Sequence, residues 1–284
     1  MVKLSKRKTE QVTSASPFLR WAGSKRRLLH KLVPYWTEQC ARYVEPFAGS
    51  AALFYALRPK TAVLSDSNGE LVRALNTVRE KPNEVYDALG TLPRGSESFY
   101  SIRKLSPSDL GDVDRAARFI FLNRFCFNGL YRTNARGEFN VPFARSGTGD
   151  FPPKDAFLRS ASLLRSADIR EGDFEKILME VVQRDDFVYL DPPYAVGNRR
   201  IFRQYGPHSF GLEDLERLQR ILVEIDARGA RFVLSYAWCA EATATFSGWT
   251  HRRVYTQRNI AGFCQHRRKA AELIVSNAVA LQPA

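Results

Sequence analysis

Cysteine is scarce in this sequence of 284 residues, which contains only Cys40, Cys126, Cys239 and Cys264. Four cysteines are too few to cross-link a chain of this length, and no two of them lie at a metal-ligand spacing. We therefore expect reduced thiols, a cytoplasmic protein and no metal site.

Long apolar runs are missing as well. No stretch approaches the roughly 18 apolar residues that a membrane span requires. The basic start MVKLSKRKTEQ has no apolar region behind it. The sequence thus predicts no membrane segment and no secretory signal, and it predicts a short flexible basic arm at the N-terminus.

Several enzyme motifs are absent. The chain has neither GxSxG nor Cys-x-x-C, which argues against serine hydrolases and zinc deaminases. The segment FAGSA has one glycine where the dinucleotide fingerprint GxGxxG has three. A pyrophosphate is therefore not the ligand that this turn predicts.

Acidic residues are outnumbered by basic ones, with 30 Asp and Glu against 43 Lys and Arg and a net charge of +13. Such an excess suits a polyanionic partner, most often nucleic acid. A merely basic soluble protein is the alternative.

Strand and helix patterns alternate in the first quarter of the chain. Apolar runs end on Glu45 and on Asp66, and helical patterns follow each of them at residues 51–57 and 70–79. A helix is also expected from residue 25, with Ser24 as its N-cap. This alternation predicts βα units of a parallel, open sheet.

The same alternation returns near the C-terminal end. The buried run FVYLD ends on Asp191, a helix is expected over Glu213–Ala227, and RFVLSYA and ELIVSN read as further strands. The middle is different, since residues 81–155 hold many Pro, Gly and Ser residues, a helical pattern over Val113–Phe125 and a hairpin signal, RTNARGEFNVPF. We predict an inserted, mainly helical domain over residues 69–155 and a sheet domain built from residues 1–68 and 156–284.

Three acids end predicted strands: Glu45, Asp66 and Asp191. Ligands of open α/β sheets bind outside the carboxyl ends of the strands. The turn at Gly49 lets a ligand approach the backbone, and Asp66 is placed to accept hydrogen bonds from ribose hydroxyls. The combination favours a nucleoside without phosphates, although Asp66 could instead be a helix N-cap.

The chemistry is concentrated in the four residues Asp191, Pro192, Pro193 and Tyr194. The prolines hold the backbone extended, so the carboxylate and the Pro192 carbonyl form two acceptors at fixed spacing. They match an NH₂ group, and Tyr194 offers a ring for stacking on a planar base. The aspartate could stabilise charge on an attacking amine and take its proton. The alternative is a strand-ending Pro-Pro turn without chemistry.

These motifs, taken in order, resemble Dam-type DNA adenine-N6 methyltransferases. The resemblance covers nearly the whole chain after residue 16 and rests on PFLRWAGSKRRLL, VEPFAGSAALF, LSDSNGELV, EGDFEKIL, LDPPYA and ELIVSN. It implies a Rossmann-like, S-adenosylmethionine-dependent methyltransferase sheet with an inserted DNA-recognition domain. It departs from the usual pattern at Ala51, where the family has a second glycine, and at GSK in place of Gly-Gly-Lys.

The resemblance also implies roles for individual residues. Cofactor contacts would come from Trp21, Lys25, Glu45, Phe47, Gly49, Asp66, Asp173 and Phe174. Of these, Asp173 would meet the amino group of the cofactor adenine and Phe174 its ring.

The target adenine cannot reach Asp191 inside a duplex, so the resemblance implies base flipping. The segment NRFCFNGLYRTNARGEFNVPFAR resembles the recognition hairpin of enzymes that methylate GATC. The implied roles are phosphate contacts for Arg124 and Asn128, insertion into the base stack for Phe127, apolar contacts to thymine for Leu130 and Pro142, and base-edge contacts for Arg20, Arg132 and Arg145. The alternative for each arginine is a solvated charge or a simple phosphate contact.

Other functions stay open on sequence grounds. No cysteine follows a proline, which argues against cytosine-C5 methyltransferases. An rRNA adenine-N6 methyltransferase, a glutamine-N5 protein methyltransferase and a catalytically inactive DNA-binding relative remain alternatives. We expect double-stranded DNA as the partner, no membrane association and a monomer in solution. The basic segment THRRVYTQRNIAGFCQHRRK is expected to line the DNA channel, or to be an exposed charged hairpin.

Overall fold

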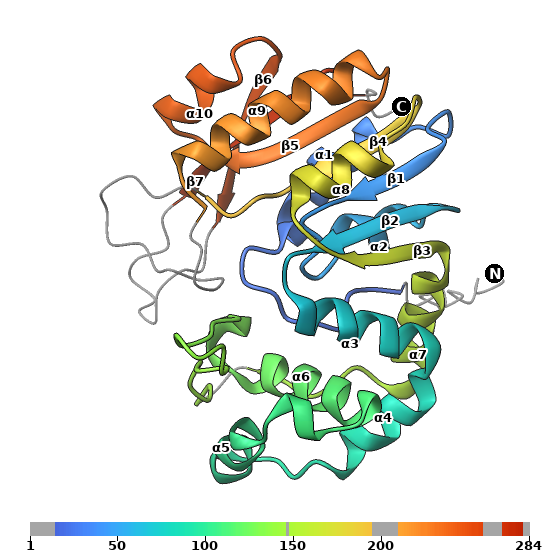
Figure 1. Ribbon diagram of the computed structural model, residues 1–284, viewed down its shortest axis with the longest axis vertical. Coiled ribbons are helices and arrows are strands. Elements are labelled where there is room, and N and C mark those ends of the chain that lie inside the picture. The colour runs from blue at the N-terminus through green and yellow to red at the C-terminus, as the bar shows by residue number, and fades with distance from the viewer. Residues whose placement is uncertain (1–14, 146–147, 195–209, 258–268, 281–284) are drawn as a thin grey trace, which may run out of the picture.

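The computed structural model describes residues 15–145, 148–194, 210–257 and 269–280 (Figure 1). Within these residues seven strands form one sheet in the order β3-β2-β1-β4-β5-β7-β6. Strands β1 to β5 are parallel, and β7 lies antiparallel between β5 and β6. The strands are β1 (Arg42–Glu45), β2 (Ala62–Asp66), β3 (Ala167–Glu171), β4 (Asp186–Leu190), β5 (Arg231–Ala237), β6 (Thr250–Gln257) and β7 (Lys269–Ser276). The predicted open and largely parallel α/β sheet is confirmed.

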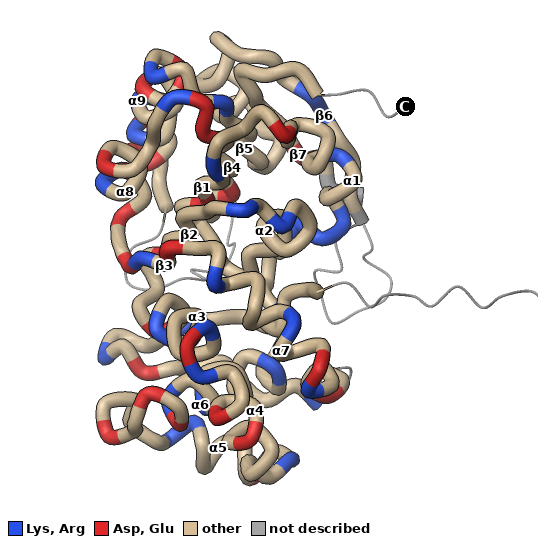
Figure 2. Tube along the Cα trace, turned by 90° about the vertical axis from the view of Figure 1, so that its right-hand side faces the viewer, with Lys and Arg blue, Asp and Glu red and all other residues tan. Residues whose placement is uncertain are grey.

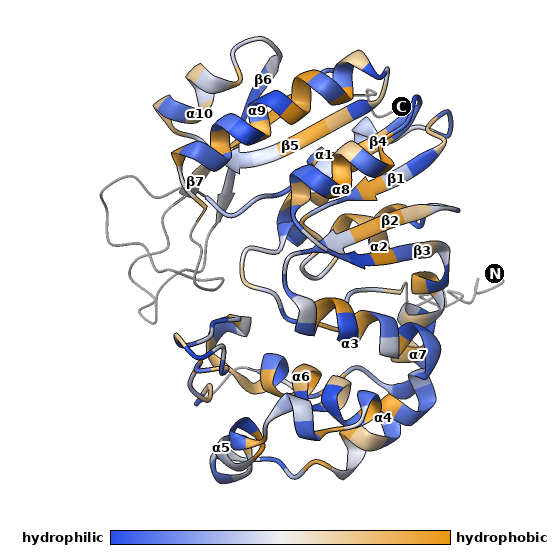
Figure 3. Ribbon diagram, in the orientation of Figure 1, coloured by the Kyte–Doolittle hydropathy of each residue, from blue (hydrophilic) through white to orange (hydrophobic). Residues whose placement is uncertain are grey.

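Both faces of this sheet are covered, because successive residues of a strand point to opposite sides. In β4, Phe187 and Tyr189 pack into the cluster that contains α2 (Ala52–Leu57), whereas Val188 and Leu190 pack against α8 (Phe174–Val181) and α9 (Leu212–Ala227). Two buried faces explain why the central strands read as continuous apolar runs, which Figure 3 shows as orange ribbons at the centre of the sheet.

The helix α9 forms as predicted. Its face of Leu215, Leu218, Leu222 and Ile225 is buried against the sheet. The Asp214 carboxylate accepts a hydrogen bond from the backbone N–H that precedes the helix, at 2.9 Å. A short helix, α10 (Ala240–Thr245), follows β5 and packs on α9. Acidic residues are frequent along α9, whereas basic residues dominate the segment 25–31 (Figure 2).

The helices between β2 and β3 lie together below the edge of the sheet in Figure 1. They are α3 (Gly69–Glu80), α4 (Pro82–Thr91), α5 (Ser96–Lys104), the short 3₁₀ turn η3 (Pro107–Asp109), α6 (Asp112–Phe125) and α7 (Lys154–Leu163). The predicted helix over Val113–Phe125 is confirmed as α6, which packs against α3, α4 and α5. The expected domain boundary at residues 155 and 156 falls inside α7, and α7 packs against α3 and α4 before the turn η5 (Leu164–Ser166) leads into β3.

The expected hairpin forms in a reduced version. Two isolated antiparallel bridges join Cys126 to Phe143 and Thr133 to Phe139, without a continuous ladder. The turn is closed by the Gly137 N–H, which donates to the Asn134 carbonyl at 3.0 Å. The 3₁₀ turn η4 (Phe127–Gly129) leads from α6 into this segment.

The expectation that Ser24 caps a helix is wrong. The segment folds as the 3₁₀ turn η1 (Lys25–Leu28), a single α-turn, α1 (Leu29–Leu32), and the 3₁₀ turn η2 (Val33–Tyr35). Ser24 makes no capping bond, and its hydroxyl instead accepts a hydrogen bond from Ser50 at 3.3 Å. Ser24 therefore ties the N-terminal segment to the turn after β1.

The thiols of Cys40, Cys126 and Cys239 are free, and Cys264 lies outside the described residues. The expected N-terminal arm also lies outside them. None of the helices in the described ranges is long and apolar enough to cross a membrane.

Candidate active site

The predicted acids meet at the carboxyl edge of the sheet. Glu45 is the last residue of β1, Asp66 is the last residue of β2, and Asp191 directly follows β4. Since β1 pairs with β2 on one side and with β4 on the other, these ends are neighbours. The strand order reverses between β1 and β4, which is where open α/β sheets bind their ligands.

The Asp191 carboxylate is held by two donors from distant parts of the chain. Its Oδ1 atom accepts hydrogen bonds from Lys25 Nζ at 2.5 Å and from Ser235 Oγ at 3.1 Å. Burial raises the pKa of Asp191 above its ordinary value, and the nearby ammonium of Lys25 opposes this shift. The side chain is 18% exposed, so a ligand can reach the carboxylate.

Tyr194 closes the other side of this corner. Its hydroxyl donates to Glu272 Oε2 at 3.3 Å, and the Lys25 ammonium lies 5.3 Å from its ring centroid. The ring also meets Tyr236 edge-on, with 5.0 Å between centroids. Among the described residues, no donor is bonded to the Pro192 carbonyl. The corner therefore presents a fixed carboxylate, a carbonyl acceptor and an aromatic ring.

The turn after β1 is built around Gly49. Its φ is +48°, and a Cβ atom there would lie 2.7 Å from Nε1 of Trp21. Both the backbone conformation and the close approach of Trp21 therefore require glycine. Ala51 also has a positive φ, +51°, a region that costs an L-residue about 1 kcal/mol. This conformation gives a physical reason for a glycine at the second position of the motif.

Asp66 binds this turn directly. Its carboxylate accepts hydrogen bonds from the backbone N–H groups of Gly49 and Asn68, each at 3.0 Å. Burial nonetheless raises the pKa of Asp66 above its ordinary value. The alternative of a helix N-cap at Asp66 is wrong, because the cap of α3 is Asn68, whose side chain accepts from Leu71 N at 3.2 Å.

Glu45 lies deeper than the other two acids and is only 2% exposed. Burial raises the pKa of Glu45 well above its ordinary value, while a hydrogen bond from the Tyr43 hydroxyl at 3.0 Å opposes the shift. Glu45 therefore sits beneath the edge, behind the turn that carries Gly49.

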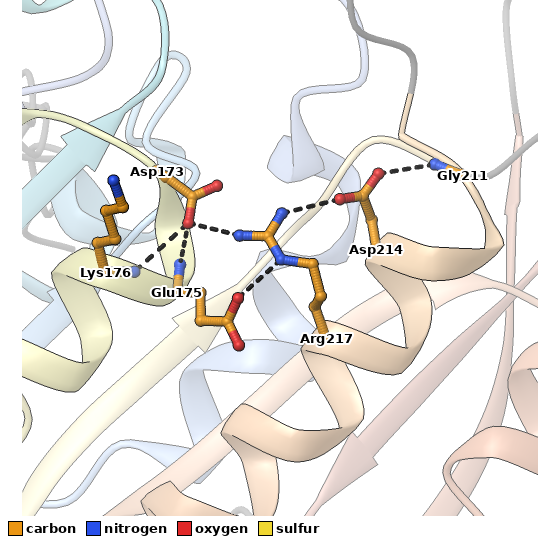
Figure 4. A network of polar contacts seen from close by, with 6 residues as sticks. All are labelled: Asp173, Glu175, Lys176, Gly211, Asp214 and Arg217. Carbon is orange, nitrogen blue, oxygen red and sulfur yellow. Dashed lines mark hydrogen bonds and ion pairs between the residues drawn. The ribbon is translucent and has the colours of Figure 1, made fainter.

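The third predicted cofactor segment lies at the start of α8. Asp173 caps this helix by accepting from Glu175 N and Lys176 N. Phe174 is buried, and its ring lies 5.1 Å from that of the half-buried Phe47. Arg217 of α9 reaches across to Asp173 (Figure 4).

The predicted DNA-contacting residues lie on the N-terminal segment and on the hairpin. Arg20 and Asn123 exchange two hydrogen bonds, Arg20 N to Oδ1 at 2.9 Å and Nδ2 to Arg20 O at 2.5 Å. Gly129, with φ +62°, packs so closely on the Arg20 backbone that a Cβ would lie 2.7 Å from its carbonyl oxygen. The Trp21 ring stacks on Tyr131 of the hairpin, with 6.2 Å between centroids. Trp21 therefore links the hairpin to the turn at Gly49.

The remaining hairpin side chains differ in exposure. Phe127 is 42% exposed, and Asn128, Pro142 and Arg145 are also exposed, whereas Leu130 packs partly against the core. In a separate contact, Arg132 Nε donates to Asn140 Oδ1 at 2.7 Å across the hairpin.

Arg124 is less accessible than its predicted role suggests. It donates to the Asp150 carbonyl, and burial together with the charge of Arg20 lowers its pKa. If Arg124 contacts a phosphate, it does so with a guanidinium that already donates a hydrogen bond to the Asp150 carbonyl.

Four residues near these sites receive no role from the sequence patterns, although Glu272 and Asn123 lie within the segments ELIVSN and NRFCFNGLYRTNARGEFNVPFAR. Ser235, Glu272, Arg217 and Asn123 reach the predicted residues only through contacts between distant segments. Over the ranges that the structure describes, no group of three or more His, Cys, Asp or Glu side chains could hold a metal ion.

A mostly parallel sheet whose order reverses between β1 and β4, with acids at the carboxyl edge, is a doubly wound α/β architecture with its ligand site at that edge. Residues 21–260 match the family of D12 class N6 adenine-specific DNA methyltransferases. The chain belongs to this family and is an adenine-specific DNA methyltransferase.

Individual relatives support this assignment over most of the chain. The Type II methyltransferase M1.LlaDCHI of Lactococcus lactis subsp. cremoris is 32% identical, over 92% of this chain and 95% of its own length. The Type II methyltransferase M.MjaIII of Methanocaldococcus jannaschii is also 32% identical, over 86% and 92%. The DNA adenine methylase of Haemophilus influenzae is 31% identical, over 91% and 92%. The relatives thus include both type II methyltransferases and DNA adenine methylases.

Proposed function

We propose that this protein transfers the methyl group of S-adenosylmethionine to N6 of an adenine flipped out of duplex DNA, within the sequence GATC. The observation that carries the proposal is the corner at the end of β4, where Lys25 and Ser235 hold the Asp191 carboxylate beside the Pro192 carbonyl. Family membership favours DNA over rRNA as the substrate.

The corner suits an exocyclic amine. The lone pair of such a nitrogen is delocalised into the purine ring, so the amine is a poor nucleophile until its hydrogens are held out of plane. The Asp191 carboxylate and the Pro192 carbonyl are acceptors for those two hydrogens, and Tyr194 stacks on the base. Asp191 stabilises the positive charge that develops on nitrogen and accepts a proton.

The cofactor would lie along the edge formed by β1, β2 and α8. When bound, S-adenosylmethionine supplies an electrophilic methyl group on a sulfonium. The donor set fits the cofactor, since Asp66 is an acceptor for ribose hydroxyls and Asp173 for the adenine amino group. Phe47 and Phe174 supply an apolar wall, and Trp21 packs over the turn at Gly49.

Lys25 and Glu45 complete the cofactor site in this proposal. The Lys25 ammonium donates to the Gly23 carbonyl and to Asp191. Its third N–H has no acceptor among the described residues, and in this proposal it donates to the cofactor. The buried Glu45 lies behind the same turn, at the end of β1.

Sequence recognition would come from the hairpin and from Arg20. The exposed Phe127 suits insertion into the base stack left by the flipped adenine. Arg20, Arg132 and Arg145 would read base edges, where a guanidinium favours guanine. In this proposal Leu130 and Pro142 contact thymine methyl groups, and Arg124 and Asn128 contact phosphates. We further propose that residues 69–155 form the recognition domain, and that the protein acts as a monomer on duplex DNA.

The test is the digestion of treated plasmid by two endonucleases, one blocked by adenine methylation within GATC and one that requires it. We expect protection from the first and cleavage by the second. The result should be the same when EDTA is present during the methylation step and is removed before digestion, because no metal site is predicted for the methyltransferase. Labelled cofactor offered with rRNA in parallel tests the alternative substrate. Methylated adenine outside GATC would reject the proposed site, and no transfer to any nucleic acid would favour a catalytically inactive DNA-binding protein.

A further inference from the structure

Arg217 lies at the centre of an ionic network between α8 and α9 (Figure 4). One of its NH groups donates to Asp173 Oδ1 at 2.6 Å, its Nε donates to Glu175 Oε2 at 2.7 Å, and the other NH donates to Asp214 Oδ1 at 2.9 Å. The guanidinium also lies over the Phe174 ring, 4.7 Å from its centroid. One side chain thus contacts both residues that are proposed to hold the cofactor adenine.

We propose that Arg217 is a positioning residue for the adenine end of the cofactor, acting through Asp173 and Phe174. This inference rests on the proposed function of the cofactor site. It adds a residue from α9 that lies outside the sequence motifs and that touches neither the methyl group nor the target base.

The hydrogen bonds of Asp173 are divided between its two oxygens. Oδ1 accepts from Glu175 N at 3.1 Å, from Lys176 N at 3.4 Å and from Arg217. Among the described residues, Oδ2 has no donor, and it points away from the network (Figure 4). Three donors on one oxygen fix the plane of the carboxylate, so the free oxygen is aimed before a ligand arrives.

Arg217 also sets the charge of this acceptor. Although partial burial works in the opposite direction, the hydrogen bond and the positive charge of Arg217 lower the pKa of Asp173. The carboxylate therefore stays ionised over the working range of pH. An ionised oxygen accepts a hydrogen bond from an amino group more strongly than a neutral one does.

The contact with Phe174 fixes the apolar part of the same subsite. The guanidinium lies over the Phe174 ring, and the same ring packs in a tilted arrangement against Phe47, with 5.1 Å between centroids. An open hollow borders the polar side of the network and is lined by Asp173, Glu175, Lys176, Met179 and Arg217, without Phe174 or Phe47. Asp173 and Arg217 therefore lie at an open surface of the protein.

A simple cross-link between α8 and α9 is the competing role for Arg217. The ligand pair that separates the two roles is S-adenosylhomocysteine and its analogue with hydrogen in place of the 6-amino group. Binding of each to the full chain is measured by calorimetry. A positioning role weakens binding of the ligand that carries the amino group much more than binding of the analogue, which still meets the Phe174 ring, whereas a cross-link role affects both ligands equally.

We expect Arg217→Ala to weaken binding of S-adenosylhomocysteine about tenfold, as for loss of one charge-assisted hydrogen bond. The 6-deamino analogue should lose about twofold or less. Arg217→Lys, which keeps the charge without the fork, should restore part of the preference. Asp214→Asn is the matched control, since it removes one partner of Arg217 that does not touch the subsite, and it should leave the preference unchanged.

Steady-state kinetics give a second readout. Arg217→Ala should raise KM for S-adenosylmethionine about tenfold while kcat stays within about twofold, because the chemistry occurs at Asp191. Equal loss of affinity for both ligands would show a structural role and overturn the inference.

Asp173→Ala separates the failure of positioning by Arg217 from the failure of the adenine subsite at Asp173. If this variant loses the preference for the amino group and Arg217→Ala keeps it, positioning by Arg217 is wrong and the subsite stands. If Asp173→Ala keeps the preference, the adenine subsite itself is wrong, and the inference fails with it.

Discussion

Lys25 and Asp191 form an ion pair across 166 residues of sequence, with 2.5 Å between Nζ and Oδ1. Their side chains are only 9% and 18% exposed. The pair joins the N-terminal segment to the end of β4. Because neither group is well solvated, each depends on the other for its charge, and the ionisation of the carboxylate proposed as catalytic depends on Lys25.

The first prediction concerns the pH dependence of methyl transfer. Burial raises the pKa of Asp191, Lys25 opposes this, and in the proposed mechanism only the ionised carboxylate can take the proton of the amine. Activity is therefore present above the pKa of Asp191 and lost as pH falls through it. Lys25→Met should raise that pKa further and move the acid limb of the kcat profile up by about one pH unit or more.

Lys31→Met is the control for this shift, because Lys31 lies in the same basic segment on α1 and makes no contact with Asp191. Its acid limb should coincide with that of the wild type. An unchanged acid limb in Lys25→Met would show that Asp191 is not the group that limits the reaction.

Ser235→Ala is the second prediction. The buried hydroxyl of Ser235 donates to Asp191 at 3.1 Å and bonds to the Tyr189 hydroxyl at 3.0 Å. Alanine nearly preserves the volume, so the fold should hold, while one hydrogen bond to a charged group is lost. We expect kcat to fall about tenfold or more in a labelled-methyl assay.

Tyr189→Phe is the matched comparison for Ser235. It removes the other partner of the Ser235 hydroxyl and leaves the bond to Asp191 in place. Its kcat should stay within about threefold of the wild type. A larger loss in Tyr189→Phe than in Ser235→Ala would assign the effect to packing rather than to Asp191.

The sequence predicts the parts of the fold that depend on local patterns. Apolar runs such as FVYLD are buried on both faces, and the helix over Glu213–Ala227 has its apolar residues at helical spacing. Strands β3 and β6 are not predicted, because ADIRE is short and half exposed and THRRVYTQ is rich in charge. Pairing with the buried strand β7 stabilises β6. Residues 258–268 of the basic segment, which is expected to line the DNA channel or to be an exposed charged hairpin, lie outside the described residues.

As with the fold, only those features of the site that depend on local sequence patterns can be predicted. The acids at strand ends can be placed from sequence, because parallel strands bring their carboxyl ends to one edge. The donors to these acids cannot, since Ser235 and Arg217 each lie 44 residues from the acid that they contact. Nothing in the local sequence of β5 or α9 distinguishes these two residues from ordinary members of a strand and a helix.

The third prediction concerns base reading by Arg132. The Asn140 side chain accepts from Arg132 Nε at 2.7 Å and so orients the guanidinium across the hairpin. Arg132→Ala should relax discrimination at one base pair, with a cost of about 1–3 kcal/mol on GATC and little loss on the substituted site. Asn140→Ala should relax discrimination at the same base pair, but by less. Both effects are measured as kcat/KM on duplexes with single base-pair substitutions.

Arg136 offers the control for this series, since its side chain is 81% exposed at the tip of the hairpin and pairs only with Glu138 in the described structure. Arg136→Ala should leave the ranking of the substituted duplexes intact. Uniform loss on every duplex in Arg132→Ala would indicate a phosphate contact instead of base reading.

The fourth prediction follows from the net charge of +13. Binding to DNA releases counterions in proportion to the phosphates contacted, so the affinity should fall linearly on a log–log plot against salt. Removing one side chain that is proposed to contact a phosphate, as in Arg124→Ala, should reduce that slope by about one. Titration of a labelled duplex at several salt concentrations measures this, and a flat response would contradict an interface dominated by phosphates.

The last prediction concerns the clamp between Asn123 and Arg20. The amide of Asn123 is buried and completes both backbone hydrogen bonds of Arg20, while the Arg20 guanidinium donates to the Arg124 carbonyl at 2.9 Å, near the end of α6. Asn123→Ala leaves these backbone groups without partners, so the free energy of unfolding should fall by about 1–3 kcal/mol.

The same change should also alter recognition, because Arg20 is proposed to read a guanine. Discrimination at that base pair should weaken in Asn123→Ala even at temperatures where the variant is fully folded. Asn76→Ala is a stability control, since the Asn76 amide donates to the Ile169 carbonyl at 3.2 Å, away from the hairpin. If both variants lose stability and neither changes base discrimination, the clamp is a structural contact, and Arg20 does not depend on it for reading DNA.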